Sequence, residues 1–269
     1  MALSFTRLST AEIPRNVLVL RNSDPGYRVD LLDKPLTQPD SGPPSTAVQD
    51  YLKTIHALGG VEQRVLPIDI AQKLDVTAPS VSGMLRRLAD AGWVEYQPGK
   101  GAQLNEAGKT EARRVIRRHR LVELFLTRVL GLDLSEVDQE AEALEHAISP
   151  RLEQALATYL GEPDEDCHGH PIPSASGELV TRSLKPLVSF KVGQTALIRE
   201  VRDDNPARLK RWIELGLVPG AQVLIVKRED VLDLFEIKIG NSLFPMSGQA
   251  LTGLLGEFSD SNHQEANKT

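Results

Sequence analysis

Residues 68–92 read IDIAQKLDVTAPSVSGMLRRLADAG, and this stretch decides the fold of the first half of the chain. A short apolar-periodic segment leads through a polar turn into a second helical segment. Thr77 is a suitable N-cap for the second helix, and Pro79 is tolerated in its first turn. Val81, Leu85 and Leu88 recur with the helical period and should face a core. The pattern predicts a helix-turn-helix.

The remaining positions of the second predicted helix carry small polar side chains and arginines. Small side chains near a helix N-terminus can approach base edges closely, and arginine reaches phosphates or guanine. Residues 93–96 and 102–104 flank a Pro/Gly turn, which predicts a β-hairpin wing. Together these elements predict a winged helix-turn-helix that binds double-stranded DNA, with a plain helical hairpin as the alternative. The predicted DNA-binding residues are Thr77, Pro79, Ser80, Ser82, Gly83, Arg86, Arg87 and, at the wing tip, Lys100.

Composition narrows the class of protein. The 269 residues have a formal net charge of −6, which argues against a protein that coats nucleic acid without preference. Cys167 is the single cysteine, so an internal disulfide framework is excluded and a reducing compartment is favoured. The chain lacks an apolar run long enough to span a membrane. We therefore expect a soluble cytoplasmic protein with no membrane partner.

Helical periodicity surrounds the central stretch. We expect helices over residues 46–58, 105–130, 134–148 and 151–160, and a disordered extension over residues 1–45, in which a strand at 17–20 is an alternative. The first half of the 105–130 helix is rich in arginine, which indicates a solvated face or supporting phosphate contacts. The later helices carry more apolar surface than one winged helix needs, which indicates a homodimer.

A cluster of acidic residues and histidines follows the DNA-binding pattern. Glu142, Glu145 and His146 stand at i, i+3 and i+4, so a helix would place them on one face as half of a metal site. Asp138 lies one turn earlier. His119 and Glu123 form a second i, i+4 pair on the preceding predicted helix. Ordinary polar side chains on a solvated helix face are the alternative.

The last third of the chain has a different pattern. Residues 161–185 form a loop in which Cys167, His168 and His170 match no closed zinc spacing, so we expect an ordinary loop rather than a soft-metal site. Short alternating runs then predict a small barrel with one helix over 206–215 and a disordered tail over 258–269. The predicted strands are 188–192, 195–201, 222–227, 234–239 and 243–246.

Residues 46 to about 256 resemble the diphtheria-toxin-repressor family of metal-dependent transcriptional regulators. The segments that carry this resemblance are Asp50–Ile55, Thr77–Ser82, His119–Leu121, Glu145–His146, His170–Pro173 and Glu214–Gly220. The resemblance implies a mainly α fold with a small β part. Its implied parts are a winged helix-turn-helix at 46–105, a helical metal-binding and dimerisation domain at 106–160, a linker at 161–185, and an SH3-like barrel of the ferrous-transport-A type at 186–257.

The resemblance also implies two metal sites. The activating site would use Asp50, Glu142, Glu145 and His146, and the second site would use His119, Glu123 and Asp138. Iron-responsive members have sulfur ligands at two of the activating positions, where this chain has carboxylates. Three carboxylates and one imidazole suit Mn²⁺, and Fe²⁺ nearly as well, so we expect Mn²⁺ as the cofactor.

Two positions depart from the manganese-type pattern. Lys53 stands where those members have a glutamate that helps to build a two-metal cluster. A cation there disfavours two ions close together, so we expect two separate sites. Members with the barrel also send ligands from it to the second site, for which Asp203 or Asp204 is a candidate.

The function that follows is a regulator of metal-homeostasis genes. Divalent metal would promote binding of the homodimer to an inverted-repeat operator. Two alternatives remain within the regulator class: an iron-responsive repressor and a winged-helix regulator that senses an organic ligand. A metalloenzyme would need a substrate pocket with a poised base, and we find no residues that supply one.

Overall fold

The computed structural model describes residues 44–202 and 205–259 of the chain. Three expectations therefore lie outside the described residues: the extension with its alternative strand at 17–20, the candidate ligands Asp203 and Asp204, and the tail beyond 259. Among the described residues, no helix combines the length and the apolar character needed to cross a membrane.

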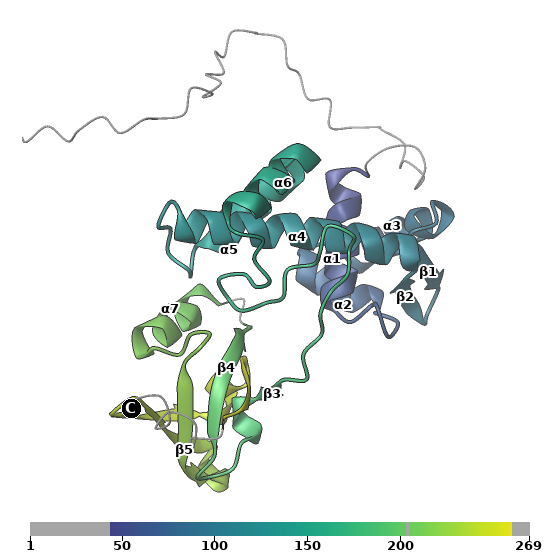
Figure 1. Ribbon diagram of the computed structural model, residues 1–269. Coiled ribbons are helices and arrows are strands. Elements are labelled where there is room, and N and C mark those ends of the chain that lie inside the picture. Colours follow the sequence, from purple (N-terminus) through teal and green to yellow (C-terminus); the bar gives the residue numbers. More distant parts are fainter. Residues whose placement is uncertain (1–43, 203–204, 260–269) are drawn as a thin grey trace, which may run out of the picture. The chain divides into compact units, whose positions relative to one another are not determined.

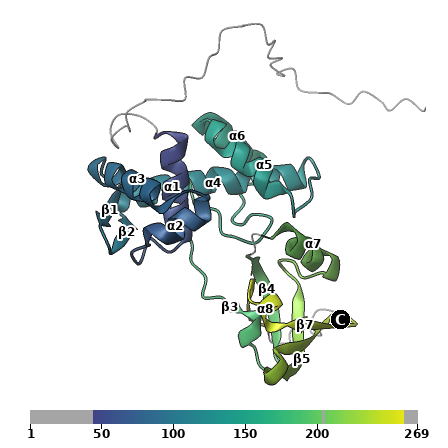
Figure 2. The same ribbon diagram turned by 180° about the vertical axis from the view of Figure 1, so that it is seen from behind.

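The winged helix-turn-helix is confirmed (Figures 1 and 2). It consists of α1 (Thr46–Ala57), α2 (Pro67–Leu74), α3 (Ala78–Asp90), and the hairpin of β1 (Val94–Gln97) with β2 (Gly101–Leu104). The Thr77 hydroxyl accepts the Ser80 N–H and caps α3 as predicted. Val81, Leu85 and Leu88 are fully buried in one core with residues of α1. α3, the helix predicted to contact DNA, and α1 are therefore parts of one packed unit.

A long helix, α4 (Glu106–Arg128), connects this unit to the helices that follow it in the chain. Figure 1 shows α4 with α1, α5 and α6 beside it, and residues of these helices contact one another. Arg117 is buried between the Glu153 carboxylate, 3.0 Å away, and the Pro173 carbonyl, 2.8 Å away. Arg118 binds the same glutamate at 3.2 Å. For Arg117, both a solvated face and a phosphate contact were therefore wrong expectations.

The single helix expected over 134–148 is wrong, because the structure divides it. The α-helix α5 covers only Val137–Leu144, and Glu145–Ala147 forms a tighter 3₁₀ turn, η1. At the start, the Asp133 carboxylate accepts hydrogen bonds from the N–H and hydroxyl of Ser135 and holds a turn. At the end, Ser149 is extended because it precedes Pro150, the first residue of α6 (Pro150–Tyr159).

The C-terminal part is a six-stranded antiparallel sheet in the order β3-β8-β4-β5-β6-β7. The expected barrel is not closed: in the described residues, the edge strands β3 and β7 do not pair with each other. The strands are β3 (Lys185–Pro186), β4 (Thr195–Val201), β5 (Gln222–Glu229), β6 (Leu234–Ile239), β7 (Ser242–Ser247) and β8 (Leu254–Phe258).

Short helices complete this part. They are η2 (Leu187–Ser189), α7 (Pro206–Leu215), η3 (Asp230–Leu232) and α8 (Gly248–Leu251). The helix expected over 206–215 is confirmed. The strand expected over 188–192 is wrong, because η2 and an irregular segment stand there, and the sequence analysis missed β8. Leu187 of η2 and Phe190 just after it are buried in the core of the sheet, which explains the strand-like apolar content of this region.

Candidate metal centre

Asp50, Glu142, Glu145 and His146 come together from three elements. Asp50 lies on α1, Glu142 on α5, and the other two residues on η1. Each of the four offers a ligand atom, and these atoms all lie within 4.8 Å of one another. His146 Nε2 is 2.8 Å from Asp50 Oδ1 and 3.3 Å from Glu145 Oε1. A helix is thus not needed to bring Glu145 and His146 to one side, since the 3₁₀ turn also does so.

The chemistry of these four residues fits a hard divalent cation. Asp50 Oδ1 is buried, and it lacks a hydrogen-bond partner of acceptable geometry although His146 Nε2 is near. A buried carboxylate oxygen without such a partner is costly unless another charge satisfies it. Oxygen and imidazole ligands without sulfur suit Mn²⁺ or Fe²⁺ better than softer metals.

The orientation of His146 is determined by two buried residues that the sequence analysis missed. Gln49 donates its Nε2–H to Glu111 Oε1 at 2.8 Å, and its Oε1 lies 2.8 Å from His146 Nδ1. Since this amide oxygen can only accept, Nδ1 must carry a proton and donate it. The lone pair at Nε2 of the neutral ring then faces Asp50 and Glu145. The signal in the sequence is a glutamine three residues before Leu52, on the buried side of α1.

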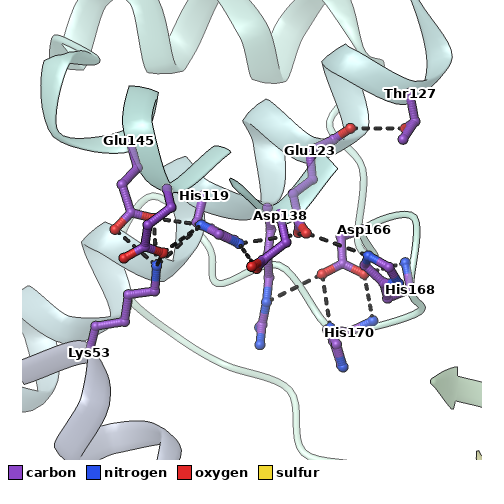
Figure 3. Close-up of polar contacts among 11 residues, drawn as sticks. Lys53, His119, Glu123, Thr127, Asp138, Glu145, Asp166, His168 and His170 are labelled. Atoms are coloured by element: carbon purple, nitrogen blue, oxygen red, sulfur yellow. Dashed lines mark hydrogen bonds and ion pairs between the residues drawn. The ribbon is translucent and has the colours of Figure 1, made fainter. Parts of the chain in front are cut away.

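His119, Glu123 and Asp138 form a second set, again with ligand atoms within 4.8 Å of one another. His119 Nε2 lies 3.3 Å from Asp138 Oδ1 and 3.6 Å from Glu123 Oε1. Burial disfavours the charged ring, but hydrogen bonds to Asp138, Glu123 and Glu145 outweigh burial and hold the pKa of His119 well above its usual range. His119 Nδ1 lies 2.6 Å from Glu145 Oε2, so this histidine joins the two sets (Figure 3).

Part of the loop over 161–185 approaches the second set. Glu123, Cys167 and His168 also offer ligand atoms within 4.8 Å of one another, and His168 Nε2 lies 3.6 Å from Glu123 Oε1. His170 is not in this group and instead lies 3.2 Å from Asp166 (Figure 3). Burial, with Glu123 and Asp166 nearby, raises the pKa of the Cys167 thiol. Loop spacing alone could not reveal this group, because its third member is on α4.

Lys53, one turn after Asp50 on α1, reaches into the first set, which consists of Asp50, Glu142, Glu145 and His146. Its Nζ lies 2.5 Å from Glu142 Oε2 and 2.7 and 2.9 Å from the two carboxylate oxygens of Glu145 (Figure 3). Burial opposes the charge on Lys53, but Glu145 and Glu142 outweigh burial and raise its pKa. Glu145 is itself fully buried, and its carboxyl pKa is lowered because His119 and Lys53 overcome the cost of burial.

The residues predicted to contact DNA lie on α3, its N-cap and the wing. Arg86, Arg87 and Lys100 are exposed, as are Thr77, Pro79 and Ser80. Ser82 and Gly83 are half-buried, and the Ser82 hydroxyl donates to the Ala78 carbonyl at 3.0 Å. Because this hydroxyl donates its hydrogen within its own helix, it can only accept a hydrogen bond from a DNA base.

Models of known domain families match three consecutive parts of the chain. Residues 45–102 match the iron-dependent repressor N-terminal DNA-binding domain, and residues 105–174 match the iron-dependent repressor metal-binding and dimerisation domain. Residues 185–248 match the FeoA domain. The diphtheria toxin repressor of Corynebacterium diphtheriae is 36% identical over 196 residues, covering 68% of this chain and 86% of the relative. The chain belongs to the diphtheria toxin repressor family.

Other members of the family agree with this assignment. The iron-dependent repressor IdeR of Mycobacterium leprae is 32% identical over 190 residues, covering 65% of this chain and 81% of the relative. A solved structure titled as a manganese-dependent transcriptional repressor in complex with manganese is 30% identical, covers 79% of this chain and 100% of its own, and superposes with a TM-score of 0.74. The family is made up of transcriptional repressors rather than enzymes. This chain is accordingly a metal-dependent, DNA-binding regulator.

The family's dimerisation domain coincides with apolar surface on this chain. Residues 105–174, which match that domain, include large apolar side chains that remain exposed just after α4 and on α5 and α6. Exposed apolar side chains in a domain of this kind are suited to contact with a second copy of the chain. The exposed residues are Val129, Leu130, Leu144, Leu152 and Tyr159.

Proposed function

We propose that this chain is a Mn²⁺-activated transcriptional regulator of metal-homeostasis genes, acting in the cytoplasm as a homodimer. In this proposal, Asp50, Glu142, Glu145 and His146 hold the activating ion. The observation that carries the proposal is the convergence of these four donors from α1 and from the α5–η1 segment. A divalent cation bound there would neutralise the carboxylates and join α1 to that segment.

The link to DNA runs through α1. Asp50 lies on the same helix as Leu52 and Ile55, which are fully buried in the core that also holds α3. A restraint on Asp50 therefore restrains the recognition helix. In a dimer, two such helices must meet successive half-sites of an inverted repeat together, so a small change in orientation affects both. Coupling of about 1–3 kcal/mol per binding event is typical of such linkage.

We assign the second ion to His119, Glu123 and Asp138, as a separate site. This assignment is supported by the position of His119 Nε2, which lies near the carboxylates of both Glu123 and Asp138. Manganese is favoured over iron because the first set contains three carboxylates and an imidazole and lacks sulfur. The similarity to a repressor whose solved structure is titled as a complex with manganese supports the same choice.

Metal-titrated DNA binding tests this function. Duplexes selected from a random pool by the Mn²⁺-loaded protein supply the operator, and binding is then measured with Mn²⁺, Fe²⁺, Zn²⁺ and chelator. We expect Glu145→Ala to lose the Mn²⁺ response. Glu140→Ala, which removes an exposed glutamate from the same segment, should behave as wild type.

Two results would contradict the proposal. Operator binding that persists undiminished in excess chelator would refute the metal switch. Activation by Fe²⁺ at much lower free concentration than Mn²⁺ would place the chain among iron-responsive repressors and refute the metal assignment alone.

A further inference from the structure

Lys53 occupies the centre of the acidic cluster and contacts both candidate sets. Besides its contacts with Glu142 and Glu145, its Nζ lies 3.2 Å from His119 Nδ1, a residue of the second set. Its side chain is only 20% exposed. The ammonium group is therefore held among donor atoms in the way that a bound cation would be, at the boundary between the two sets.

The charges of the cluster decide how many ions it can hold. The first set has three carboxylates, and Lys53 adds one positive charge in direct contact with two of them. One divalent ion together with Lys53 neutralises these three carboxylates. A second divalent ion within the same set would leave an excess of two positive charges in a partly buried site, which is strongly unfavourable.

We propose that Lys53 is an internal cation that limits the Asp50, Glu142, Glu145 and His146 set to a single divalent ion. In this role, it takes the position that a second ion would need and keeps the two sets apart. The inference rests on the proposed metal function of these residues. Before an ion arrives, Lys53 also holds the Glu142 and Glu145 side chains together, in place of the repulsion they would otherwise have.

Substitutions of Lys53 should change ion binding in two distinct ways. Lys53→Glu replaces the positive charge with a fourth carboxylate, so the set then balances two divalent ions, and we expect one additional Mn²⁺ per chain. Lys53→Met and Lys53→Gln remove the charge that repels the single ion and competes for its ligands. We expect them to bind that ion at least about tenfold more tightly.

Titration calorimetry and metal analysis of the dialysed full-length chain measure both effects. The binding event at the first set is identified as the one that Glu145→Ala abolishes. Lys53→Arg keeps the charge and should retain the wild-type number of ions. Lys109→Met is the matched control, since it removes a lysine that pairs with Glu106 at 2.8 Å on the first turn of α4. Melting curves in chelator report folding, and the use of two neutral variants guards against a packing defect in one of them.

The outcomes separate this inference from the proposed function. An unchanged ion count in folded Lys53→Glu, together with unchanged affinity in the neutral variants, would show that Lys53 is merely structural and would overturn the inference alone. If the wild-type chain shows no Mn²⁺ binding that depends on Glu145, the proposed function itself fails. An additional ion in Lys53→Glu with none gained in Lys53→Arg would support the inference.

Discussion

The orientation of His146 in the first set depends on its contact with Gln49, which is in turn held by Glu111. His146 could present either ring nitrogen to an ion, and the contact with Gln49 leaves Nε2 for this purpose because Gln49 is itself oriented by Glu111. Carboxylate or amide partners behind a metal-binding histidine raise its affinity for the metal by holding the ring and its tautomer. We therefore expect Gln49 to be a positioning residue that acts through His146.

Removal of the Gln49 amide should weaken ion binding without removing a ligand. For Gln49→Met, we expect the Mn²⁺ affinity of the first set to fall about 10- to 100-fold. Gln103→Met is the control, because Gln103 Nε2 donates to the Val61 carbonyl at 3.2 Å in the wing region and does not contact His146. Calorimetry of both variants decides the point. Equal affinities for Gln49→Met and wild type would remove the positioning role.

His56, at the end of α1, should make the stability of the metal-free protein depend on pH. Burial and the charges of Arg113 and Arg120 lower the pKa of His56 from 6.5 to about 4. Between these values, the unfolded chain takes up a proton that the folded chain does not. The contribution of neutral His56 to the free energy of unfolding is therefore complete above about pH 6.5 and is lost as the pH falls toward 4. After allowance for partial exposure, we expect a loss of about 1–2 kcal/mol.

Comparison with a variant isolates this single group. Urea unfolding of wild type and His56→Gln is measured at pH 7.5 and 4.5, both in chelator. Between these pH values, the free energy of unfolding should fall more for wild type than for His56→Gln. The effects of the other titrating groups cancel when the two proteins are compared. A ring titration of His56 by NMR with a midpoint near 6.5 would contradict the shift.

At the scale of the element, α3 combines a buried stripe with an unusually small outer side. Gly83 lies in the middle of this helix, and an added Cβ would meet nothing within 4 Å. Gly83→Ala should therefore raise the free energy of unfolding by about 0.5–1 kcal/mol. The same methyl group lies among the residues predicted to approach base edges, so operator affinity should fall. A stability gain combined with a binding loss is the expected signature.

A second helical glycine provides a control of opposite sign. In Gly108, on α4, an added Cβ would lie 2.1 Å from the Trp93 carbonyl oxygen, so Gly108→Ala should destabilise the fold. Thermal unfolding and DNA binding of both variants are compared. If Gly83→Ala binds operator as tightly as wild type, this part of α3 does not approach the DNA closely.

How well each element was predicted depends on whether its cause is local. The start of α3 followed from its Thr77 cap, and the extents of α1 and α4 followed from periodicity, because these signals lie within the segment itself. The helix expected over 134–148 is shortened by the Asp133 turn before α5 and by Pro150 after η1, and periodicity cannot detect either. Strand β8 was missed because a short Leu-Leu-Gly-Glu-Phe run lacks alternation and becomes a strand by pairing with β4 and β3.

The candidate site shows the same division. Its candidate ligands were predicted from spacing together with the family resemblance, because those residue types at those positions suit a metal. The contacts of Gln49 with Glu111 and of Lys53 with Glu145, and the proximity of Cys167 to Glu123 of α4, join distant segments. Such contacts depend on how helices pack, and one sequence without the fold does not specify them.

At the scale of the whole molecule, the regulator must bind a polyanion while carrying a net charge of −6. We therefore expect binding to depend on the exposed positive charges of Arg86, Arg87 and Lys100, and to weaken as salt is raised. A cation in the first set removes negative charge, which by itself would favour any DNA. If the ion instead favours operator DNA specifically, a further consequence follows that simple neutralisation of negative charge would not produce.

That consequence is reciprocity between metal and operator. If Mn²⁺ raises operator affinity by a given factor, the operator must raise Mn²⁺ affinity by the same factor, about 5- to 150-fold for a coupling of 1–3 kcal/mol. We expect this gain with the operator duplex, a much smaller gain with a scrambled duplex of equal length, and none in Glu145→Ala. Calorimetric Mn²⁺ titrations with each duplex at fixed salt measure it. Equal gains with operator and scrambled DNA would mean that the ion acts only through charge, because a restraint on α1 and α3 can favour only the DNA whose half-sites match the two recognition helices.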